Sequence, residues 1–416
     1  MDRIIFHVDV NSAYLSWEAA RRIKDGGIDI RSIPSAIGGD REKRTGIILA
    51  KSIPAKAYGI KTGEPVSMAL RKCPQLYIAK PDFLLYEKNS KAFLEICKEY
   101  TPVVEKFSID ECFLDMTGMG KIYPNIVAVA EEIRERIKYE LGFTVNVGVG
   151  SNKLLAKMAS DFEKPDKVHT LFLNEIQSKM WHLPIRDLFF VGDATAEKLE
   201  RMFIKTIGDL ARLDILIVKS LIGEKLGEQL HNFANGIDNS PVAKSHDRAK
   251  GYSNSITLEY DVSNVLEAQK ILLALADSTA MRMRADGGRA FCVSILIRDV
   301  DFNDRSHQKK LLCATDITLE IFDVCKELIG ELWDKKKALR LIGVSLMDIT
   351  FEDSEQLSFF DDRKRDKSRI IDKTVDNIRN KFGKNTIVRG GVYKNNIRVA
   401  KKHFTAADKN KNNTDD

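Results

Sequence analysis

The sequence lacks the long apolar runs and paired cysteines that would assign it to several broad classes. No apolar stretch approaches the ~18 residues that a membrane helix requires, so we expect no membrane segment. The 6 cysteines form no CxxC pair and have no metal-ligand spacing, which indicates reduced thiols in a cytoplasmic protein. The N-terminal MDRIIFHVDV has polar breaks and no small-residue cleavage site, so we expect no signal peptide.

A strongly basic body is absent as well. The net charge of +6 comes from the C-terminal end, where residues 361–416 hold 16 Lys and Arg against 8 Asp and Glu. The first 360 residues carry 50 basic and 52 acidic side chains. Overall charge therefore gives no reason to expect a nucleic-acid surface on the folded body, and any basic groove has to come from local placement.

The chain does have enough apolar residues, 44% of 416, to fold as two to four domains. Periodicity predicts a mixed first region, with strands at 4–10, 46–52 and 144–150 and helices at 12–24, 54–59, 82–100, 125–140 and 152–162. Residues 170–240 are expected to be helical, and the polar stretch 237–249 is typical of a linker. Beyond it we expect a separate α+β unit with helices at 264–285 and 317–333, followed by one more helix at 368–382.

Asp9 ends an otherwise apolar strand, and it is the first candidate for chemistry. A buried carboxylate needs a cation or several hydrogen-bond donors, because an unpaired charge is unfavourable away from water. Two interpretations remain open from this residue alone. The carboxylate either binds a metal ion or belongs to a structural ion network next to the following helix.

Asp110 and Glu111 are the second candidate. Neighbouring residues on a regular strand face opposite sides of a sheet, so both can serve one site only at a hairpin tip or bulge. The flanking runs, VVEKFSI and CFLDM, have hairpin length. A solvated polar turn is the alternative. Oxygen ligands of this kind suit Mg²⁺ or Mn²⁺ rather than zinc.

Four segments together resemble a known family: HVDVNSAYLSWE, AKSIPAKAYGIKTGEP, SIDECFLD and TVNVGVGSNKLLAKMASDFEKP. In this order and spacing they are similar to the Y-family translesion DNA polymerases of the DinB/UmuC type. The similarity extends from about residue 3 to residue 350 and weakens beyond 170. Several motifs in the right order are a far stronger signal than any one of them alone.

The resemblance implies a multidomain α/β and α+β protein with the right-hand polymerase fold. It predicts a ferredoxin-like palm at 1–10 and 77–168, small fingers at 11–76, and a helical thumb at 169–237. A linker at 238–249 is expected to lead to an α+β little-finger domain at 250–351. Residues 352–416 would hold a clamp-binding peptide and a basic tail.

The same resemblance implies two-metal phosphoryl transfer to a primer 3′ end. Asp9, Asp110 and the backbone carbonyl of Val10 would hold the nucleotide-side Mg²⁺, and Glu111 would join the aspartates at the primer-side Mg²⁺. Mn²⁺ would substitute for Mg²⁺. Tyr14 matches the position whose ring excludes a 2′-hydroxyl from the sugar site.

Three lysines are candidates for binding the nucleotide's phosphates, and one isoleucine occupies a position where a hydrogen-bond donor is expected. Lys164 matches the family's triphosphate-binding lysine. DinB-type fingers usually place a Tyr and, three residues later, an Arg on the triphosphate, where this sequence has Ile53 and Lys56. The pair resembles the UmuC-type branch. Ile53 cannot donate a hydrogen bond, so we expect weaker triphosphate binding unless another residue, such as Lys51, supplies the missing contact.

The resemblance extends to DNA-binding and recruitment segments. Residues 188–210 resemble a helix-hairpin-helix, but Phe190 stands where its first glycine is expected, and only Gly192 remains. In the little finger, the grip on duplex DNA would come from segregated charges such as Arg282, Arg284, Arg289, Lys309 and Lys310. The stretch Gln356, Leu357, Ser358, Phe359 and Phe360 resembles the peptide that docks into a bacterial sliding clamp.

The resulting expectation is a monomeric DNA-directed DNA polymerase. Its partners would be primer-template DNA, deoxynucleoside triphosphates and the bacterial sliding clamp, with no membrane. Two other classes stay open at this point: a non-catalytic DNA-binding or regulatory relative, and a nucleotide cyclase with a similar palm. Primer extension by the purified protein separates all three.

Overall fold

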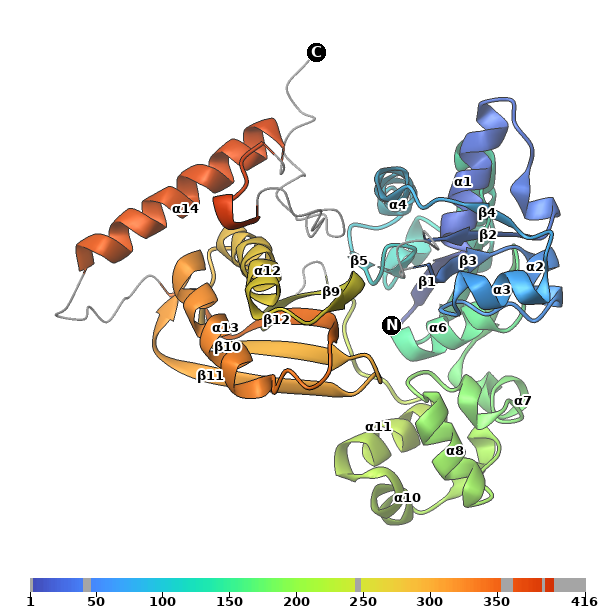
Figure 1. The fold of residues 1–416 in the computed structure, drawn as a ribbon. Coiled ribbons are helices and arrows are strands. Elements are labelled where there is room, and N and C mark those ends of the chain that lie inside the picture. The colour runs from blue at the N-terminus through green and yellow to red at the C-terminus, as the bar shows by residue number, and fades with distance from the viewer. Residues whose placement is uncertain (1–2, 40–45, 244–247, 353–361, 384–385, 393–416) are drawn as a thin grey trace. The chain divides into compact units, whose positions relative to one another are not determined.

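The computed structural model describes residues 3–39, 46–243, 248–352, 362–383 and 386–392. The chain divides into two compact units, with the boundary between residues 246 and 247. Figure 1 shows the first unit as the blue-to-green half of the chain and the second as the yellow-to-red half. None of the helices within the described ranges combines the length and apolarity needed to cross a bilayer.

The first unit is built around a five-stranded sheet with the strand order β5-β6-β1-β7-β8. Its strands are β1 (Ile5–Val10), β5 (Val104–Lys106), β6 (Glu111–Asp115), β7 (Val145–Gly150) and β8 (Val168–Leu171). The central β1 runs antiparallel to both β6 and β7, and β8 is parallel to β7. The expected strands at 4–10 and 144–150 are confirmed, and so is a hairpin that places residues 107–110 at its tip.

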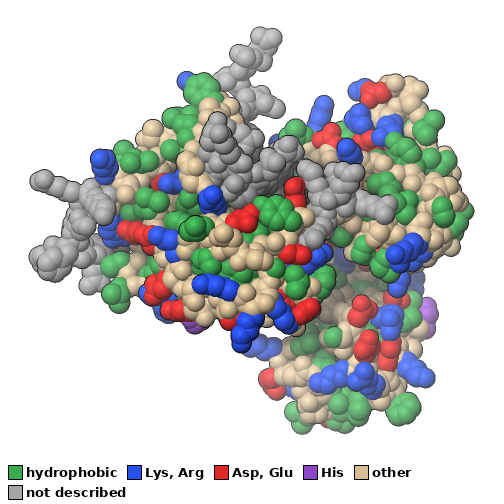
Figure 2. Space-filling view, viewed as in Figure 1, with side chains coloured by type: hydrophobic (Ala, Val, Ile, Leu, Met, Phe, Trp, Pro, Cys, Tyr) green, Lys and Arg blue, Asp and Glu red, His purple; other side chains and the backbone are tan. Residues whose placement is uncertain are grey.

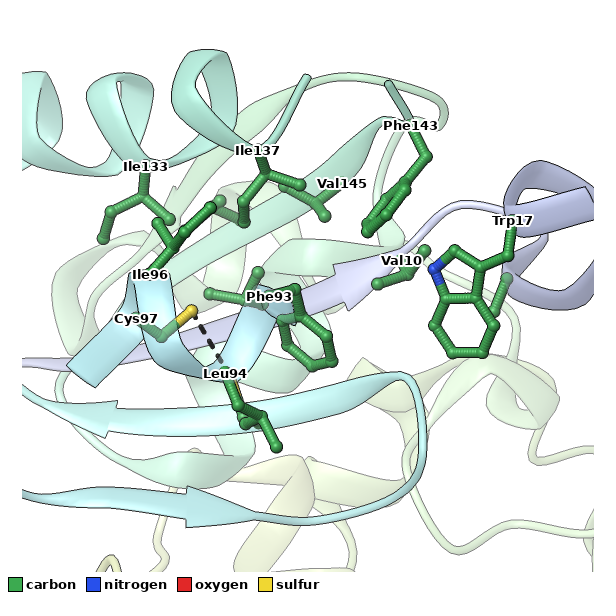
Figure 3. Close-up of a cluster of buried hydrophobic side chains, with 14 of the residues drawn as sticks. Val10, Trp17, Phe93, Leu94, Ile96, Cys97, Ile133, Ile137, Phe143 and Val145 are labelled. Atoms are coloured by element: carbon green, nitrogen blue, oxygen red, sulfur yellow. Dashed lines mark hydrogen bonds between the residues drawn. The ribbon is translucent and has the colours of Figure 1, made fainter. Parts of the chain in front are cut away.

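Helices cover both faces of this sheet: α1 (Ala13–Lys24), α4 (Phe83–Lys98), α5 (Ile126–Arg136) continued by η3 (Ile137–Leu141), and α6 (Lys153–Asp161). The alternation along β1 decides which side chain meets which helix. Phe6, Val8 and Val10 point into a core with α1, α4 and α5. Figure 3 shows part of this core, where Trp17 and Phe93 lie near Val10.

The opposite face of β1 carries Ile5, His7 and Asp9 and packs against α6. This helix lies unusually close to the sheet because β7 presents glycine there. A Cβ at Gly148 would overlap the backbone carbonyl of Ala156 and lie 2.5 Å from the backbone nitrogen of Ser160. Glycine at this position therefore sets the distance between α6 and the strand that carries Asp9.

The remaining parts of the first unit are a small sheet and a helical bundle. The sheet has the order β3-β2-β4 and comprises β2 (Ser35–Gly38), β3 (Ile48–Lys51) and β4 (Tyr77–Ala79), with η1 (Ile30–Ser32), α2 (Ile53–Ala57) and α3 (Val66–Lys72). The bundle comprises η4 (Leu173–Glu175), α7 (Ile176–Lys179), η5 (Ile185–Asp187), α8 (Asp193–Arg201), α9 (Ile207–Arg212), α10 (Ile215–Ile222) and α11 (Glu224–Ala234). A further short turn, η2 (Met119–Lys121), follows β6. The small sheet has an apolar cluster of its own, whereas the cluster of the bundle also includes Leu155 and Met158 of α6 and Leu171 of β8.

The second unit is a four-stranded antiparallel sheet with the order β11-β10-β12-β9. Its elements are β9 (Gly251–Val262), α12 (Val265–Ala285), β10 (Arg289–Asp299), β11 (Asp304–Thr315), α13 (Thr318–Leu332), β12 (Leu339–Thr350), α14 (Asp362–Phe382) and η6 (Gly390–Val392). Helices α12 and α13 pack on one face of the sheet and bury its apolar side chains (Figure 1). The helices predicted at 264–285 and 317–333 are confirmed, and α14 begins six residues before its expected start at 368.

Helix α14 is held to the second unit by ion pairs. Asp372 is only 3% exposed. It accepts a hydrogen bond from the backbone N–H of Thr318 at 2.8 Å and pairs with Arg389 and, at 3.5 Å, with Arg284. Arg284 also pairs with Asp376 at 2.7 Å. Since buried ion pairs are stable only when every partner is present, these contacts fix α14 on α12.

Candidate active site

The three acidic residues expected to act together converge at one end of the central strands. Asp9 on β1 lies directly opposite Glu111 on β6 in the strand register. The backbone N–H of Val10 donates to the carbonyl of Asp110 at 3.0 Å, which extends the pairing by one residue. Asp9 is 7% exposed, so its carboxylate is largely withdrawn from water.

The hairpin tip between β5 and β6 explains how two consecutive acids can serve one site. The backbone N–H groups of Phe107 and Ser108 both donate to the carbonyl of Glu111, at 3.0 and 3.1 Å. The Ser108 hydroxyl donates to Asp110 Oδ1 at 2.6 Å. The chain thus leaves regular strand geometry at Asp110, and the two adjacent side chains are freed from the strict alternation of a strand.

Two ammonium groups lie among these carboxylates. Lys164 donates a short hydrogen bond to Asp9, and its Nζ lies 2.7 Å from Asp161. Lys157 Nζ lies 2.6 Å from Glu111 and 3.9 Å from Asp9. Within the ranges that the structure describes, no three His, Cys, Asp or Glu side chains are grouped closely enough to hold a metal ion.

The electrostatics of the site are those of buried anions that need positive charge. Burial raises the pKa of the Asp9 carboxyl to about 6, although Lys164 and Lys157 oppose the rise. Burial would lower the pKa of Lys157, but Asp9, Asp161 and Glu111 outweigh it and raise that pKa above its ordinary value. The metal-ligand atoms that the acidic side chains offer are all oxygens, which Mg²⁺ and Mn²⁺ prefer as ligands. The donor set therefore fits divalent cations.

Lys157 was not among the residues singled out from the sequence. It sits in the apolar helix α6 and is only 9% exposed, which is unusual for a lysine. The sequence feature that could have identified Lys157 is its position in NKLLAKMASDF, four residues before Asp161 on the same helix face. Its proximity to Glu111 depends on the close approach of α6 to β7, which no local pattern reveals.

Tyr14 projects from the first turn of α1 beside the acids and is half-buried. Its ring stacks on Tyr86 with the centroids 4.5 Å apart and the planes at 14°, and its edge faces Phe83 at 6.4 Å. Burial and the neighbouring Asp110 charge raise the pKa of the Tyr14 hydroxyl, so it stays neutral. The ring is thus fixed in orientation by two other aromatic side chains.

A cavity of about 450 Å³ opens between these residues and the small sheet. Its volume falls within the range of ligand sites, roughly 300–1,000 Å³. The large sheet and the first turn of α1 supply one wall, with Asp9, Asp110, Tyr14 and Lys164 among its residues. The opposite wall comes from the β3–α2 segment and includes Lys51, Ile53 and Lys56. The cavity therefore has carboxylates together with Lys164 at one side, and Lys51 and Lys56 at the other.

Charge elsewhere on the surface is mixed. On the face shown in Figure 2, basic and acidic side chains are interspersed on each unit. Several of the basic residues expected to grip DNA are engaged within the second unit. Arg284 is turned towards α14, Lys309 pairs with Glu327 at 2.6 Å, and Lys310 lies 3.6 Å from Asp348. The expectation for Arg284 is wrong, because its side chain is 6% exposed within those pairs.

The helix-hairpin-helix segment has Phe190 in the left-handed region, at φ 71°, with the side chain 58% exposed. Glycine normally occupies such a position, since a side chain there is strained. Gly192 caps the N-terminus of α8. Residues 356–360, the expected clamp-binding peptide, lie outside the described residues.

Comparison with known proteins agrees with this geometry. The sequence model of the impB/mucB/samB family matches residues 8–161, and that of its C-terminal domain matches 249–359. The thumb domain of DNA polymerase-iota matches 186–238. The chain is 45% identical over 390 residues to a DNA polymerase IV of Clostridium acetobutylicum, a match that covers 94% of this chain and 98% of that protein. A DNA polymerase IV of Acetivibrio thermocellus is 39% identical over 394 residues, covering 94% and 97%.

Solved structures give the same fold. The Y-family polymerase chimera Dbh-Dpo4(243-245)-Dbh aligns with a TM-score of 0.73 at 22% identity and covers 84% of this chain and 100% of that one. DinB from Sulfolobus solfataricus aligns with a TM-score of 0.54, also at 22% identity and with the same coverage. The fold is thus that of a right-hand polymerase, and the chain belongs to the Y family of DNA polymerases. Within that family it is of the DinB type, together with the DNA polymerase IV proteins. The cyclase and the non-catalytic relative receive no support from these matches.

Proposed function

We propose that this chain is a template-directed translesion DNA polymerase that adds deoxynucleotides to a primer 3′ end by two-metal phosphoryl transfer. The observation that carries the proposal is the pairing of Asp9 with Glu111, with Asp110 beside them, at the edge of a cavity of nucleotide size. Family membership and the 45% identity to a DNA polymerase IV support the reaction class.

Asp9, Asp110 and the carbonyl of Val10 would hold a nucleotide-side Mg²⁺, and Glu111 would share in holding a primer-side Mg²⁺. When bound, the two ions lower the pKa of the attacking hydroxyl and neutralise the leaving pyrophosphate, and Mn²⁺ substitutes for Mg²⁺. The protein's own contribution is to hold these carboxylates together in a largely buried place. Lys157 assists by balancing their charge at 2.6 Å from Glu111.

The remaining residues select and orient substrates. Tyr14, fixed by Tyr86 and Phe83, would lie against the sugar and leave no room for a 2′-hydroxyl. Lys164 and Lys56 would bind the triphosphate, with Lys164 leaving Asp9 as the nucleotide and its ion arrive. Gln356, Leu357, Phe359 and Phe360 would tether the enzyme to a bacterial sliding clamp, which raises the effective concentration of primer ends without new contacts at the active site.

Primer extension by the purified protein tests the proposal. With a recessed primer, four deoxynucleotides and Mg²⁺, we expect template-directed products, including products that pass an abasic site. A non-catalytic relative binds the same DNA and extends nothing. A nucleotide cyclase instead converts a free nucleoside triphosphate to a cyclic monophosphate without DNA, so the two alternatives give different results in the same reactions.

A further inference from the structure

The β3–α2 wall of the cavity contains a third lysine beside the expected triphosphate ligands Lys56 and Lys164. Lys51 is the last residue of β3 and lines the cavity together with Ile53 and Lys56. Ile53 is 64% exposed and has no group that can donate to a phosphate oxygen. The wall thus offers an ammonium group two residues before the position at which a donor is missing.

Lys51 is oriented by a neutral partner. Its Nζ donates to the hydroxyl of Thr62 at 3.2 Å, and Thr62 also lines the cavity. Among the described residues, no carboxylate forms an ion pair with it. Glu64 contributes to its electrostatic surroundings, but that carboxylate is 2.5 Å from Lys72. A threonine hydroxyl orients an ammonium group without neutralising it, so the charge of Lys51 stays available.

The two lysines among the acids, of which Lys164 lines the cavity and Lys157 does not, have a different environment. Lys157 and Lys164 each lie within 3 Å of a carboxylate, and the surrounding acids raise the pKa of both lysines. For Lys51, burial and the nearby Lys56 lower the pKa instead. Two cations that face one cavity repel each other, and the repulsion is relieved when an anion binds between them. The β3–α2 wall is therefore suited to a polyanion.

We propose that Lys51, positioned by Thr62, binds the triphosphate of the incoming nucleotide together with Lys56, and that it supplies the contact which Ile53 cannot make. This inference rests on the function proposed above, because it takes the cavity to be the nucleotide site. A charge-assisted hydrogen bond of this kind corresponds to about a ten- to hundredfold change in affinity. Lys51 acts on binding, so its effect falls on KM rather than on kcat.

Single-nucleotide insertion kinetics on primer-template DNA test the proposal. Lys51→Met removes the ammonium group and keeps the aliphatic stem, so we expect KM for the deoxynucleotide to rise about ten- to hundredfold, with kcat changed by less than about threefold. Lys51→Arg keeps the charge and should restore KM to within a few fold of the wild-type value. Thr62→Val removes the orienting hydroxyl and should give an intermediate KM.

The matched control is Lys61→Met. Lys61 lies next to Thr62 on the same lobe, is exposed, and does not line the cavity. We expect its KM to equal that of the wild type. If Lys51→Met also leaves KM unchanged, or if Lys51→Arg fails to restore it, the proposed role of the Lys51 charge is wrong.

A second measurement separates this inference from the proposed function. Inorganic tripolyphosphate binding to the full chain, followed by calorimetry without DNA, reports the anion site alone. Weaker binding to Lys51→Met than to Lys61→Met supports the site even if the wild type extends no primer, in which case only the polymerase proposal fails. Equal binding to the two variants, with normal extension by the wild type, overturns the Lys51 proposal and leaves the polymerase proposal standing.

Discussion

Lys157→Met is the change whose consequences follow most directly from the geometry of the site. The substitution keeps most of the apolar stem of Lys157 and removes the ammonium group that lies 2.6 Å from Glu111 and 3.9 Å from Asp9. Glu111 and Asp9 then face each other across the paired strands with less positive charge between them. Two buried carboxylates in this arrangement repel, and both lose solvation that nothing replaces.

The size of the effect follows from the burial of the three side chains. Lys157, Glu111 and Asp9 have side-chain exposures of 11%, 18% and 10%. Removing one partner of a fully buried ion pair costs about 3–5 kcal/mol, and partial exposure here reduces the expected loss to about 2–4 kcal/mol. For a unit of this size, such a loss lowers the melting temperature by roughly 5–15 °C.

The assay is thermal unfolding in EDTA and in Mg²⁺, followed by scanning calorimetry so that the two units can be resolved. Divalent cations bind the folded acids and stabilise the native state by mass action. The Mg²⁺-dependent rise in melting temperature should therefore be larger for Lys157→Met than for the wild type, because the cation replaces the lost ammonium charge. Lys138→Met is the control, since Lys138 pairs with Asp166 at 2.8 Å in a more exposed place, where the loss of an ion pair changes stability little.

Two results would refute this reasoning. If Lys157→Met melts in EDTA at the wild-type temperature, the lysine does not balance the acids in solution. If the variant is destabilised but Mg²⁺ stabilises it no more than it stabilises the wild type, then the cation and the ammonium group do not occupy the same electrostatic environment, and the assignment of these acids to metal binding is undermined.

Three further predictions follow from other parts of the chain. Tyr14→Ala should admit ribonucleotides much more readily, and an unchanged preference for deoxynucleotides in competition assays would place sugar discrimination elsewhere. Replacing Leu357, Phe359 and Phe360 with Ala should leave single-nucleotide insertion intact and remove stimulation by a bacterial sliding clamp, whereas normal stimulation would remove the clamp from the list of partners. Asp372→Ala should destabilise the second unit by about 3 kcal/mol, because two arginines lose a buried partner, and a denaturation midpoint unchanged in that unit would contradict the ion-pair account of α14.

The acidic residues of the site and the strands that carry them could be predicted from the sequence. Asp9 lies at the end of a near-continuous apolar run that predicts a buried strand, and the length of the runs around Asp110 and Glu111 predicts a hairpin. Local pattern decides both features, since strand period and turn position are short-range properties. The convergence of the three residues followed from the family resemblance, and the register of β1 with β6 agrees with it.

Features that depend on the approach of distant segments were not predictable in the same way. The position of Lys157 depends on the absence of a side chain at Gly148, which lets α6 lie close to β7. Helix α14 was expected, but its docking was not. Asp372 pairs with Arg284 and Arg389, which lie on other segments that are far apart in the sequence. The short strands β2 and β4 carry too few residues for a period to be recognised.

The central claim, that Asp9, Asp110 and Glu111 together perform phosphoryl transfer, is tested most directly by single-turnover nucleotide insertion with Asp110→Ala and Glu111→Ala. Asp115→Asn is the control, because Asp115 ends the same strand β6 at a distance from the site and an asparagine can still accept its hydrogen bond from the backbone of Thr117. We predict that both alanine variants remain folded and bind primer-template DNA but show no detectable insertion, whereas Asp115→Asn inserts at the wild-type rate. Insertion by either alanine variant within about tenfold of the wild-type rate would contradict the claim.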